Sequence, residues 1–275
     1  MVLIHIILNE AKKARGRDGE GLSSRYLRIP ASVCLFVSIL LLLTCFGIPS
    51  SSAQPLLDQP TIKNSSFRSG EVLKYNVKVR GVPAGTQIMR VNGKKSLDGY
   101  EVYHVESISR ASSLFNIFYP FSSRMESFIH SKELHPLHYR KKIRDGGYIG
   151  STAVDFDSVN QVARIVKDEE RTELRVPARI QDELSIIYLL RTKEMEVGRK
   201  YEFPALIGTE ALNANVVVLR IEELKTVLGN LKTIVVKTIP KDITMWLTND
   251  AARIPVRIEA STKVGKLVSN LKEMH

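Results

Sequence analysis

Apolar and polar residues alternate with a period of two in many short segments between residues 70 and 271. In the first segment Leu73, Tyr75, Val77 and Val79 are separated by charged or amide side chains. Successive side chains of a β-strand point to opposite faces of a sheet, so this pattern predicts strands with one apolar and one solvated face. The chain is therefore predicted to be mainly β, with a curved antiparallel sheet or half-barrel and minor helical content.

Turn residues separate the predicted strands. Asn92-Gly93 and Asp98-Gly99 are dipeptides preferred in tight turns, and Gly229-Asn230 is a further hairpin signal. We therefore expect antiparallel neighbours joined by short turns. The predicted strands cover residues 73–79, 86–91, 100–109, 122–130, 137–144, 148–156, 162–166, 172–176, 216–222, 231–239, 243–248, 254–258 and 264–271.

One segment departs from this alternation and predicts a helix over Glu183–Lys193. Asp182 precedes it and is a good N-cap, because a carboxylate can accept the free N–H groups of a first helical turn. The segment has almost no polar face, and a helix that is apolar all round must be covered on both sides. We expect it to lie across the concave face of the sheet, with a loop, an aromatic patch or a ligand on its back. The stripe assigned to the sheet is Leu184, Ile187 and Tyr188, and the other side holds Ile186 and Leu190.

A charge-free apolar segment near the N-terminus predicts export. No charged residue lies between Ile29 and Leu57, and Arg25 and Arg28 come just before this stretch. Basic residues, then an apolar core, then the small residues Ser51-Ser52-Ala53 are the arrangement of a bacterial export signal. We divide the chain into a basic cytoplasmic region (1–28), a signal peptide or membrane anchor (29–53), a linker (54–69) and one exported β-rich domain (70–275).

Two versions of the apolar segment are compatible with the sequence. A cleaved signal releases the domain, whereas an uncleaved anchor tethers it to the inner membrane through residues 29–48. The positive-inside rule keeps the basic flank in the cytoplasm in both cases, so the predicted location is the periplasm. Both cysteines, Cys34 and Cys45, lie within the apolar segment, which leaves the predicted exported domain without a disulfide or a thiolate metal site.

The chain is basic, with a formal net charge of +11. The charge is dispersed, so solubility is its simplest role. Outside the cytoplasm a basic body is otherwise expected to meet anionic lipid headgroups or glycans, and not nucleic acid. Arg140, Lys141, Lys142 and Arg144 are predicted to form an exposed face that protects a sheet edge.

A dense apolar patch interrupts the strand pattern between residues 112 and 121. It is rich in aromatic residues and contains Pro120. We weigh a loop tucked into the core against a lip that faces a ligand. In the second interpretation the patch reaches the free side of the predicted helix. The candidate ligand-binding residues are then Phe115, Phe118, Tyr119, Phe121, Ile186 and Leu190.

Three groups of residues carry a resemblance to a known family, one near the start of the domain, one in the predicted helix and one around the tryptophan. These residues are Gly70, Glu71, Tyr75, Gly85, Asp182, Tyr188, Arg191, Trp246, Asp250 and Pro255. In this order and spacing the chain resembles an uncharacterised family of exported bacterial proteins, domain of unknown function thirty-one zero eight, from Phe67 to about Leu271. The resemblance implies an exported, mostly antiparallel domain, and it implies no established activity and no catalytic residues.

Common enzyme motifs are absent from the sequence, which has no Gly-x-Ser-x-Gly, no His-Glu-x-x-His and no glycine-rich phosphate loop. His135 and His138 flank Pro136, which blocks a regular helix, and no acidic third ligand has a suggestive spacing. We therefore predict no enzyme, no cofactor and no metal site. The carboxylates that could still converge in three dimensions are Glu126, Asp155, Asp182 and Asp250.

Three hypotheses for function remain. The first is a non-enzymatic periplasmic binding or carrier module for a hydrophobic or lipid-like envelope component, which would use the apolar helix and the aromatic patch. The second is a structural or adaptor domain with a filled core that binds a protein partner through a sheet edge. A hydrolase with unrecognised carboxylates is third. A dry cavity beneath Leu184–Leu190 would favour the carrier, and a solid core would favour the adaptor.

Overall fold

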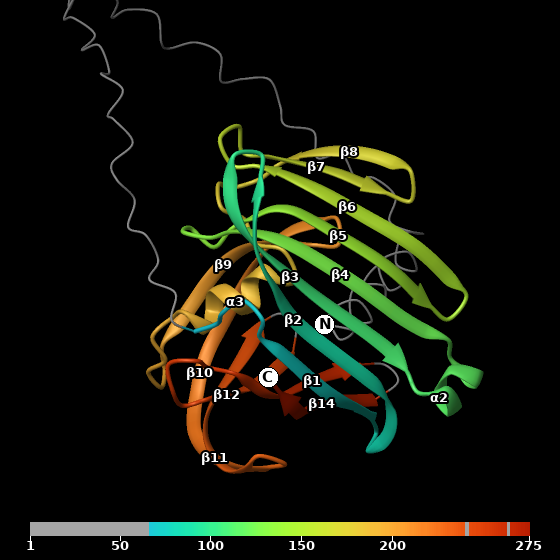
Figure 1. The fold of residues 1–275 in the computed structure, drawn as a ribbon, viewed down its shortest axis with the longest axis vertical. Helices are drawn as coiled ribbons and strands as arrows, with labels where there is room; N and C mark the ends of the chain where they lie inside the picture. The colour runs from blue at the N-terminus through green and yellow to red at the C-terminus, as the bar shows by residue number, and fades with distance from the viewer. Residues whose placement is uncertain (1–65, 240–241, 263–264) are drawn as a thin grey trace, which may run out of the picture.

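The computed structural model describes residues 66–239, 242–262 and 265–275, and fourteen strands within them form one antiparallel sheet (Figure 1). Two short helices accompany the sheet in these residues, α2 (Ser113–Phe118) and α3 (Ser185–Arg191). The strands are β1 (Val72–Val79), β2 (Val82–Leu97), β3 (Tyr100–Ala111), β4 (Phe121–His130), β5 (Pro136–Asp145), β6 (Tyr148–Asp157), β7 (Val162–Lys167), β8 (Glu170–Arg175), β9 (Lys200–Ile207), β10 (Glu210–Thr226), β11 (Gly229–Ile239), β12 (Ile243–Thr248), β13 (Pro255–Thr262) and β14 (Gly265–Met274).

The sheet consists of two meanders that meet at the first and last strands. One meander runs from β1 to β8 and the other from β9 to β14, and β1 pairs with β14 to join them (Figure 1). The twist that L-residues impose on strands curls a sheet of this width around its concave face. The strands β8 and β9 are its two edges and do not pair with each other, so the barrel stays open. The predicted curved antiparallel sheet is confirmed.

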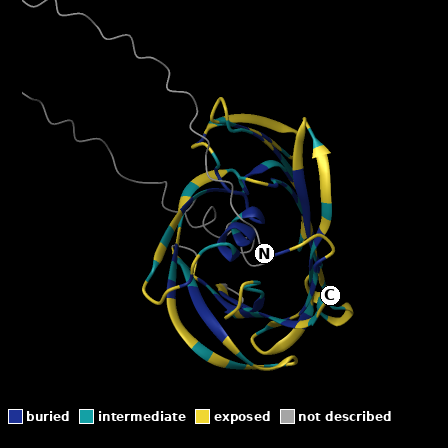
Figure 2. Cartoon of the chain, turned by 60° about the vertical axis from the view of Figure 1, so that its left-hand side comes forward, coloured by how far each residue is buried: buried dark blue, intermediate teal, exposed yellow. Residues whose placement is uncertain are grey.

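The connection from β8 to β9 runs inside the curved sheet and carries α3, which lies at the centre of the ring of strands (Figure 2). On its way the connection covers part of the β9 edge. The Gln181 N–H donates to the carbonyl of Pro204, and the Leu206 N–H donates to the carbonyl of Gln181, both at 2.8 Å. These bonds anchor the connection to the sheet immediately before α3 begins.

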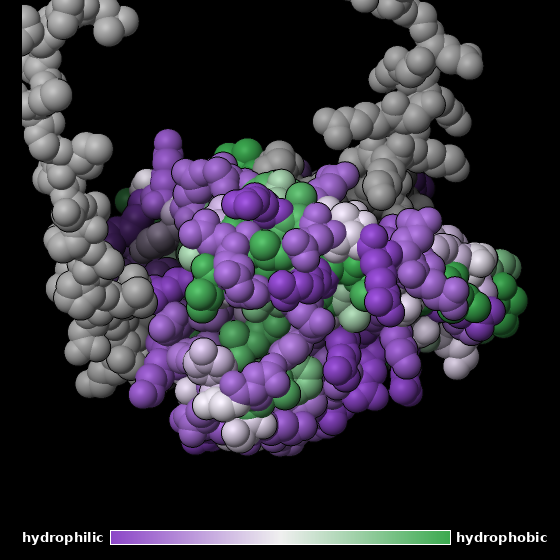
Figure 3. All heavy atoms as spheres, turned by 90° about the horizontal axis from the view of Figure 1, so that it is seen from above, coloured by the Kyte–Doolittle hydropathy of each residue, from purple (hydrophilic) through white to green (hydrophobic). Residues whose placement is uncertain are grey.

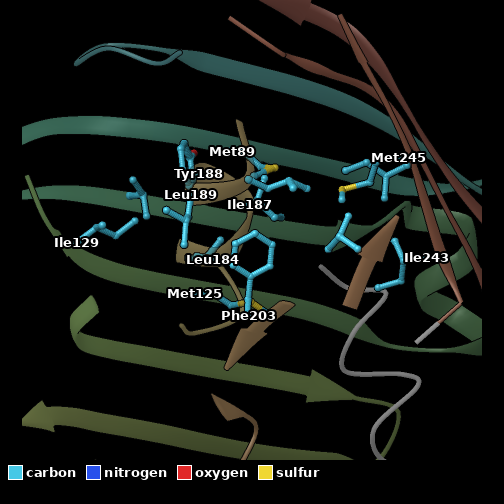
Figure 4. Packing of buried hydrophobic residues seen from close by; sticks show 14 of the residues in the cluster. Met89, Met125, Ile129, Leu184, Ile187, Tyr188, Leu189, Phe203, Ile243 and Met245 are labelled. Atoms are coloured by element: carbon cyan, nitrogen blue, oxygen red, sulfur yellow. The ribbon is translucent and has the colours of Figure 1, made fainter. Parts of the chain in front are cut away.

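The core of the domain is the space between α3 and the concave face of the sheet. Leu184, Tyr188 and Leu190 are almost completely buried there. They belong to one apolar cluster with residues from both meanders, among them Met125 of β4 and Phe203 of β9 (Figure 4). Apolar burial of this extent is the main source of stability in such a domain. The position predicted for the apolar helix is the one observed.

The helix itself is shorter than the predicted Glu183–Lys193. At its start, Asp182 accepts the N–H groups of Leu184 and Ser185, so regular helical structure begins only at Ser185. At its end, the N–H groups of Thr192 and Lys193 bond to carbonyls three residues back. Hydrogen bonds of this 3₁₀ type are common in the last turn of an α-helix, because the last carbonyl groups have no N–H donor four residues ahead within the helix.

Two other local predictions were wrong. Asn92-Gly93, predicted as a turn, lies inside β2, where the pairing with β3 shifts register between Val91 and Gly93. Gly93 has a φ of 121°, a conformation that favours glycine and suits a bulge better than a tight turn. The sequence also did not predict β9 (Lys200–Ile207), whose alternation is interrupted by Pro204. Pro204 is tolerated because β9 is an edge strand of the sheet.

The start of the domain differs from the predicted linker boundary. Ser66 and Phe67, assigned to the linker, are buried, and the Phe67 ring packs edge-on against Tyr103 and Tyr188. The predicted cytoplasmic region, the signal or anchor and residues 54–65 of the linker lie outside the described residues. Within the described part of the chain, neither helix is long and apolar enough to cross a bilayer.

Candidate functional site

Asp182 holds the start of α3 in the interior of the barrel. Its Oδ1 accepts hydrogen bonds from the backbone N–H groups of Leu184 and Ser185, each at 2.7 Å. Its Oδ2 accepts a bond of 2.5 Å from the hydroxyl of Ser127, which lies on β4. Burial raises the pKa of Asp182 to about 6, because removal from water disfavours the ionised carboxylate more than these three donors favour it.

A buried ion pair extends this contact to the next strand. Lys141 of β5 donates to both carboxylate oxygens of Glu183, at 2.9 and 3.0 Å, and both side chains are almost fully buried. The prediction of an exposed, edge-protecting position was wrong for Lys141, because β5 lies between β4 and β6 and Lys141 faces the interior. A charge in that position requires a partner, since an unpaired buried ion is strongly destabilising.

Arg191 holds the other end of α3. Its guanidinium donates to both carboxylate oxygens of Glu71, each at 2.7 Å, and also to the carbonyls of Ser66 and Ala252. These acceptors lie before β1 and in the turn after β12, which are far apart in the sequence. The buried Arg191 side chain therefore connects the end of α3 both to the segment before β1 and to the turn after β12.

Other residues of the family-like motifs also have structural contacts. The hydroxyl of Tyr75 donates to the Pro255 carbonyl at 2.8 Å. The Trp246 indole N–H donates to Glu222 at 2.6 Å, and the Trp246 side chain is 7% exposed. Asp250 accepts backbone N–H groups in the turn between β12 and β13. These motif residues therefore have contacts that stabilise the fold.

Two of the residues predicted to bind a ligand, Ile186 and Leu190, lie on α3. Leu190 is buried in the apolar cluster, and Ile186 is half-buried and packs against the same cluster. The side of α3 on which a ligand was predicted to bind is thus covered by protein at Leu190. The packing around Leu190 is therefore that of a filled core, which excludes this position as a ligand contact.

The aromatic patch forms α2, a six-residue helix between β3 and β4. The hydroxyl of Ser112 accepts the N–H of Phe115, so a serine N-cap starts the helix where β3 ends. Leu114, Ile117 and Phe118 are 76%, 73% and 86% exposed. Their spacing of i, i+3 and i+4 places them on one face of the helix. Large apolar side chains so exposed and so close together are unusual on a soluble surface.

α2 is fastened to the turn between β5 and β6. The Tyr119 hydroxyl donates to Asp145 at 2.5 Å, and the Gly146 N–H donates to the Pro120 carbonyl at 2.9 Å. The side-chain carbonyl of Asn116 accepts the N–H of Phe121, the first residue of β4. Three bonds at the C-terminal end of a short helix restrict its rotation, so they hold the exposed apolar face outward.

The prediction that the aromatic patch forms a lip over the long apolar helix was wrong. α2 lies at the end of the β3–β4 hairpin, while α3 lies within the curved sheet (Figure 1). Phe118 and Tyr119 are exposed and Phe115 is half-buried, whereas Phe121 is buried on the inner face of β4. The patch is therefore neither a lip over α3 nor a loop tucked into the core. Figure 3 shows hydrophobic residues among the polar ones both over the middle of one face and at its right-hand end.

A groove of about 680 Å³ begins beside α2 on the outer, convex face of β3 to β6. Arg110 and Ser122, the residues that flank α2 on the two strands, are part of its wall. Its other walls come from the facing parts of β5 and β6 and from the β7–β8 turn. The residues that line it include Arg124, Lys142, Arg144, Ile149, Asp168 and Glu169. The sequence signal for this groove was the alternation of basic residues along β5, which we had assigned to a sheet edge.

The four carboxylates considered for catalysis do not meet. Asp182 is in the interior, and Asp250 is in the β12–β13 turn. Glu126 lies on the outer face of β4 beside Arg124, and Asp155 pairs with His138. No group of three or more potential metal-ligating side chains occurs among the described residues. None of these carboxylates forms a pair suited to acid–base chemistry at an accessible site.

Comparison with known proteins gives a family and a fold. The family model described as a protein of unknown function (DUF3108) matches residues 74–272. Comparison with curated proteins gives no match. The family is the one that the sequence motifs resemble, so that expectation is confirmed.

One solved structure shares the fold at very low sequence identity, and two others have lower similarity scores. A β-barrel-like protein of the DUF1849 family from Brucella abortus has a TM-score of 0.51 at 8% identity, covering 76% of this chain and 98% of its own. A protein inferred to be a lipoprotein, from Parabacteroides distasonis, has a TM-score of 0.35 at 9% identity, covering 79% and 100%. A protein inferred to be exported, from Bacteroides fragilis and with a YmcC-like fold, has a TM-score of 0.34 at 10% identity, covering 78% and 98%. None of the three is named as an enzyme, and the first likeness concerns the fold alone.

Proposed function

The chain belongs to the DUF3108 family of proteins of unknown function, and we propose that it is a non-enzymatic envelope module that binds the surface of a phospholipid bilayer through α2. The observation that carries the proposal is the apolar face of α2, formed by Leu114, Ile117 and Phe118. This ligand belongs to the hydrophobic, lipid-like class expected from the sequence. The binding surface is outside the barrel, whereas the sequence interpretation placed it over α3.

The dimensions of α2 suit shallow insertion into a membrane surface. An interfacial helix buries one apolar face at the boundary between headgroups and acyl chains, and its polar flanks stay among the headgroups. α2 offers three large apolar side chains on one face, and cationic Arg110 and Arg144 lie on the adjoining strands. Lipid phosphates are negatively charged, so the cations beside the apolar face complement a phospholipid surface better than an apolar protein partner.

Binding to vesicles tests this proposal. We expect the exported domain to float with vesicles of phosphatidylcholine and phosphatidylglycerol, and the double variant Ile117→Glu with Phe118→Glu to bind roughly tenfold more weakly or worse. Val159→Glu is the matched control, because Val159 is 87% exposed in the turn at the opposite end of β6 and should leave binding unchanged. A parent protein that does not bind vesicles, or a double variant that binds as the parent does, would refute the proposal.

The proposed location is the envelope side of the inner membrane, reached through the predicted signal or anchor at residues 29–53. An alkaline phosphatase fused after His275 should be active in cells, because that enzyme folds only in an oxidising compartment. An inactive fusion whose full length is present in the cytoplasm would contradict export.

A second candidate function, a carrier with its ligand inside the barrel, is supported by one feature of the inner wall. Gln87 Oε1, Ser123 Oγ and Ser269 Oγ are buried without a hydrogen-bond partner. Buried polar atoms are normally paired, so these three could accept or donate bonds to a polar ligand group or to water. Native mass spectrometry of protein purified from its own envelope distinguishes the two. A co-purifying amphiphile would favour the carrier, and an unliganded mass would leave the membrane-binding proposal as the better account.

The adaptor alternative has less support. The β9 edge is partly occupied by Gln181, and β8 presents mainly charged and polar side chains, from Glu170 to Arg175. Charged edge strands are a common protection against strand addition.

A further inference from the structure

We propose that the groove beside α2 binds the phosphate of a phospholipid headgroup, with Arg110 and Arg144 holding the phosphate above Ser122. This inference rests on the proposed function and deepens it. α2 would supply insertion into the bilayer, and the groove would supply recognition of the headgroup. The two contributions come from different residues, so they can be tested separately.

The register of three strands brings the two arginines together. Arg110 of β3 is paired with Ser122 of β4, and Ser122 is paired with Arg144 of β5. Residues paired across neighbouring strands point to the same face of the sheet. Arg110 and Arg144 are therefore two strands apart, about 10 Å between their backbones, with a small hydroxyl side chain between them. Two long guanidinium side chains can converge over that distance on one phosphate, and the space above serine leaves room for it.

A second row of cations lies beside the first. Arg124 of β4 is paired with Lys142 of β5, and both line the groove. Arg124 is already engaged, because it donates to Glu106 at 2.8 Å and to Glu126 at 3.3 Å. Lys142 is exposed, as are the two arginines of the first row, and none of the three makes an ion pair among the described residues. The groove thus has three exposed cations without a direct ion-pair partner among the described residues.

Two carboxylates line the other end of the groove and limit where an anion can bind. Asp168 accepts the Tyr148 hydroxyl at 2.6 Å and the Ser151 N–H at 2.7 Å. These bonds keep the pKa of Asp168 below its ordinary value, so it is ionised at neutral pH. With Glu169 beside it in the β7–β8 turn, that end repels anions. A phosphate is therefore expected at the β3–β5 end, which is also the end next to α2.

The position of the groove favours a lipid phosphate over a free anion. Arg110 lies three residues before the start of α2, and Ser122 lies four residues after its end. A headgroup held above Ser122 would therefore be next to the helix that inserts into the same leaflet. Ile149, which is 75% exposed, lies on the same face and extends the apolar surface beyond the cations.

Two kinds of vesicle distinguish the contribution of the groove to membrane binding from that of α2. Vesicles of phosphatidylcholine with phosphatidylglycerol present phosphate, whereas vesicles of digalactosyl diacylglycerol present an apolar interior without phosphate or charge. We expect the parent to bind the phospholipid vesicles more tightly. The double variant Arg110→Gln with Arg144→Gln should lose roughly 30-fold on phospholipid and nothing on the glycolipid. Ile117→Glu with Phe118→Glu should lose binding to both.

Matched variants control for net charge and for folding. Lys200→Gln with Lys272→Gln removes the same charge from exposed residues of β9 and β14 and should leave the phospholipid preference unchanged. Ser122→Asp places a negative charge between the arginines and should abolish the preference, while melting temperatures of all variants stay near that of the parent. Equal binding of the parent to both vesicle types would overturn the headgroup site and leave α2 as the membrane contact. Loss of preference in the Lys200 and Lys272 control, or full displacement of the protein by millimolar inorganic phosphate, would also overturn it.

Discussion

The guanidinium of Arg191 donates one hydrogen bond to each carboxylate oxygen of Glu71, both at 2.7 Å, across 120 positions of sequence. The pair joins the last residue of α3 to the residue before β1, and the Arg191 side chain is 1% exposed. Bidentate pairing of this kind is directional as well as strong. The Arg191–Glu71 pair therefore fixes the orientation of α3, because apolar packing alone is compatible with several orientations of this helix.

Replacing one residue of this pair should lower the free energy of unfolding much more than replacing both. Arg191→Met would leave the Glu71 carboxylate buried without its cation, and we expect a loss of about 3–5 kcal/mol in the free energy of unfolding. Arg191→Met combined with Glu71→Met should recover a large part of that loss. Urea denaturation of the three proteins measures both. A single variant as stable as the parent would mean that water reaches Glu71.

Asp182 should make stability depend on pH between about 4 and 6. Its folded-state pKa of about 6 lies above the ordinary value of 3.8, so the folded state binds a proton more tightly than the unfolded state. The contribution is fully present below pH 3.8 and is lost as the pH rises through 6, and it amounts to roughly 3 kcal/mol. Unfolding free energies measured from pH 4 to 6.5 should fall relative to those of Asp182→Asn. Glu183 and Tyr139 are present in both proteins, so a parallel pair of curves would contradict the assignment to Asp182.

Trp246 should be important for stability because it is buried and belongs to the apolar cluster of the core. Its ring is covered by Arg257 at 5.2 Å, and its N–H is bonded to Glu222. Trp246→Ala should cost about 3–5 kcal/mol of unfolding free energy, as for other large buried aromatic residues. Trp246→Phe keeps the ring contact and loses the hydrogen bond, so its melting temperature should fall between those of the parent and the alanine variant. An unchanged melting temperature for Trp246→Ala would show that the ring is dispensable.

Gly85 should not tolerate a larger residue. It is paired with Ala111 on β3, and a Cβ atom at this position would lie 2.2 Å from the backbone oxygen of Arg110. Gly85→Ala must therefore separate β2 from β3, at a cost of about 1–3 kcal/mol. Gly147→Ala is the control, because a Cβ there meets nothing within 4 Å. Thermal denaturation compares the two, and equal melting temperatures would show that the strands adjust without cost.

Alternation along the chain was sufficient to predict most strands, because a strand with one buried face needs only its own residues to show the pattern. Leu73, Tyr75 and Val77 are buried and their neighbours are not, as the period of two requires. The same local argument placed α3, since a helix without a polar face can lie only where both sides are covered. β9 and the bulge at Gly93 were missed because proline and glycine have several structural roles that the sequence does not distinguish.

The surroundings of individual residues were decided only by the tertiary structure. Hydropathy identified Ile117 and Phe118 as apolar, but an apolar residue is equally compatible with a core and with an exposed contact surface. Their exposure follows from the place of α2 at the end of a hairpin, beyond the reach of the interior. Likewise the basic residues of β5 look alike in sequence, yet Lys141 is buried against Glu183 and Arg144 faces the groove. Lys141 and Arg144 lie on opposite faces of β5, and the curvature and packing of the whole sheet decide which of these faces is the interior.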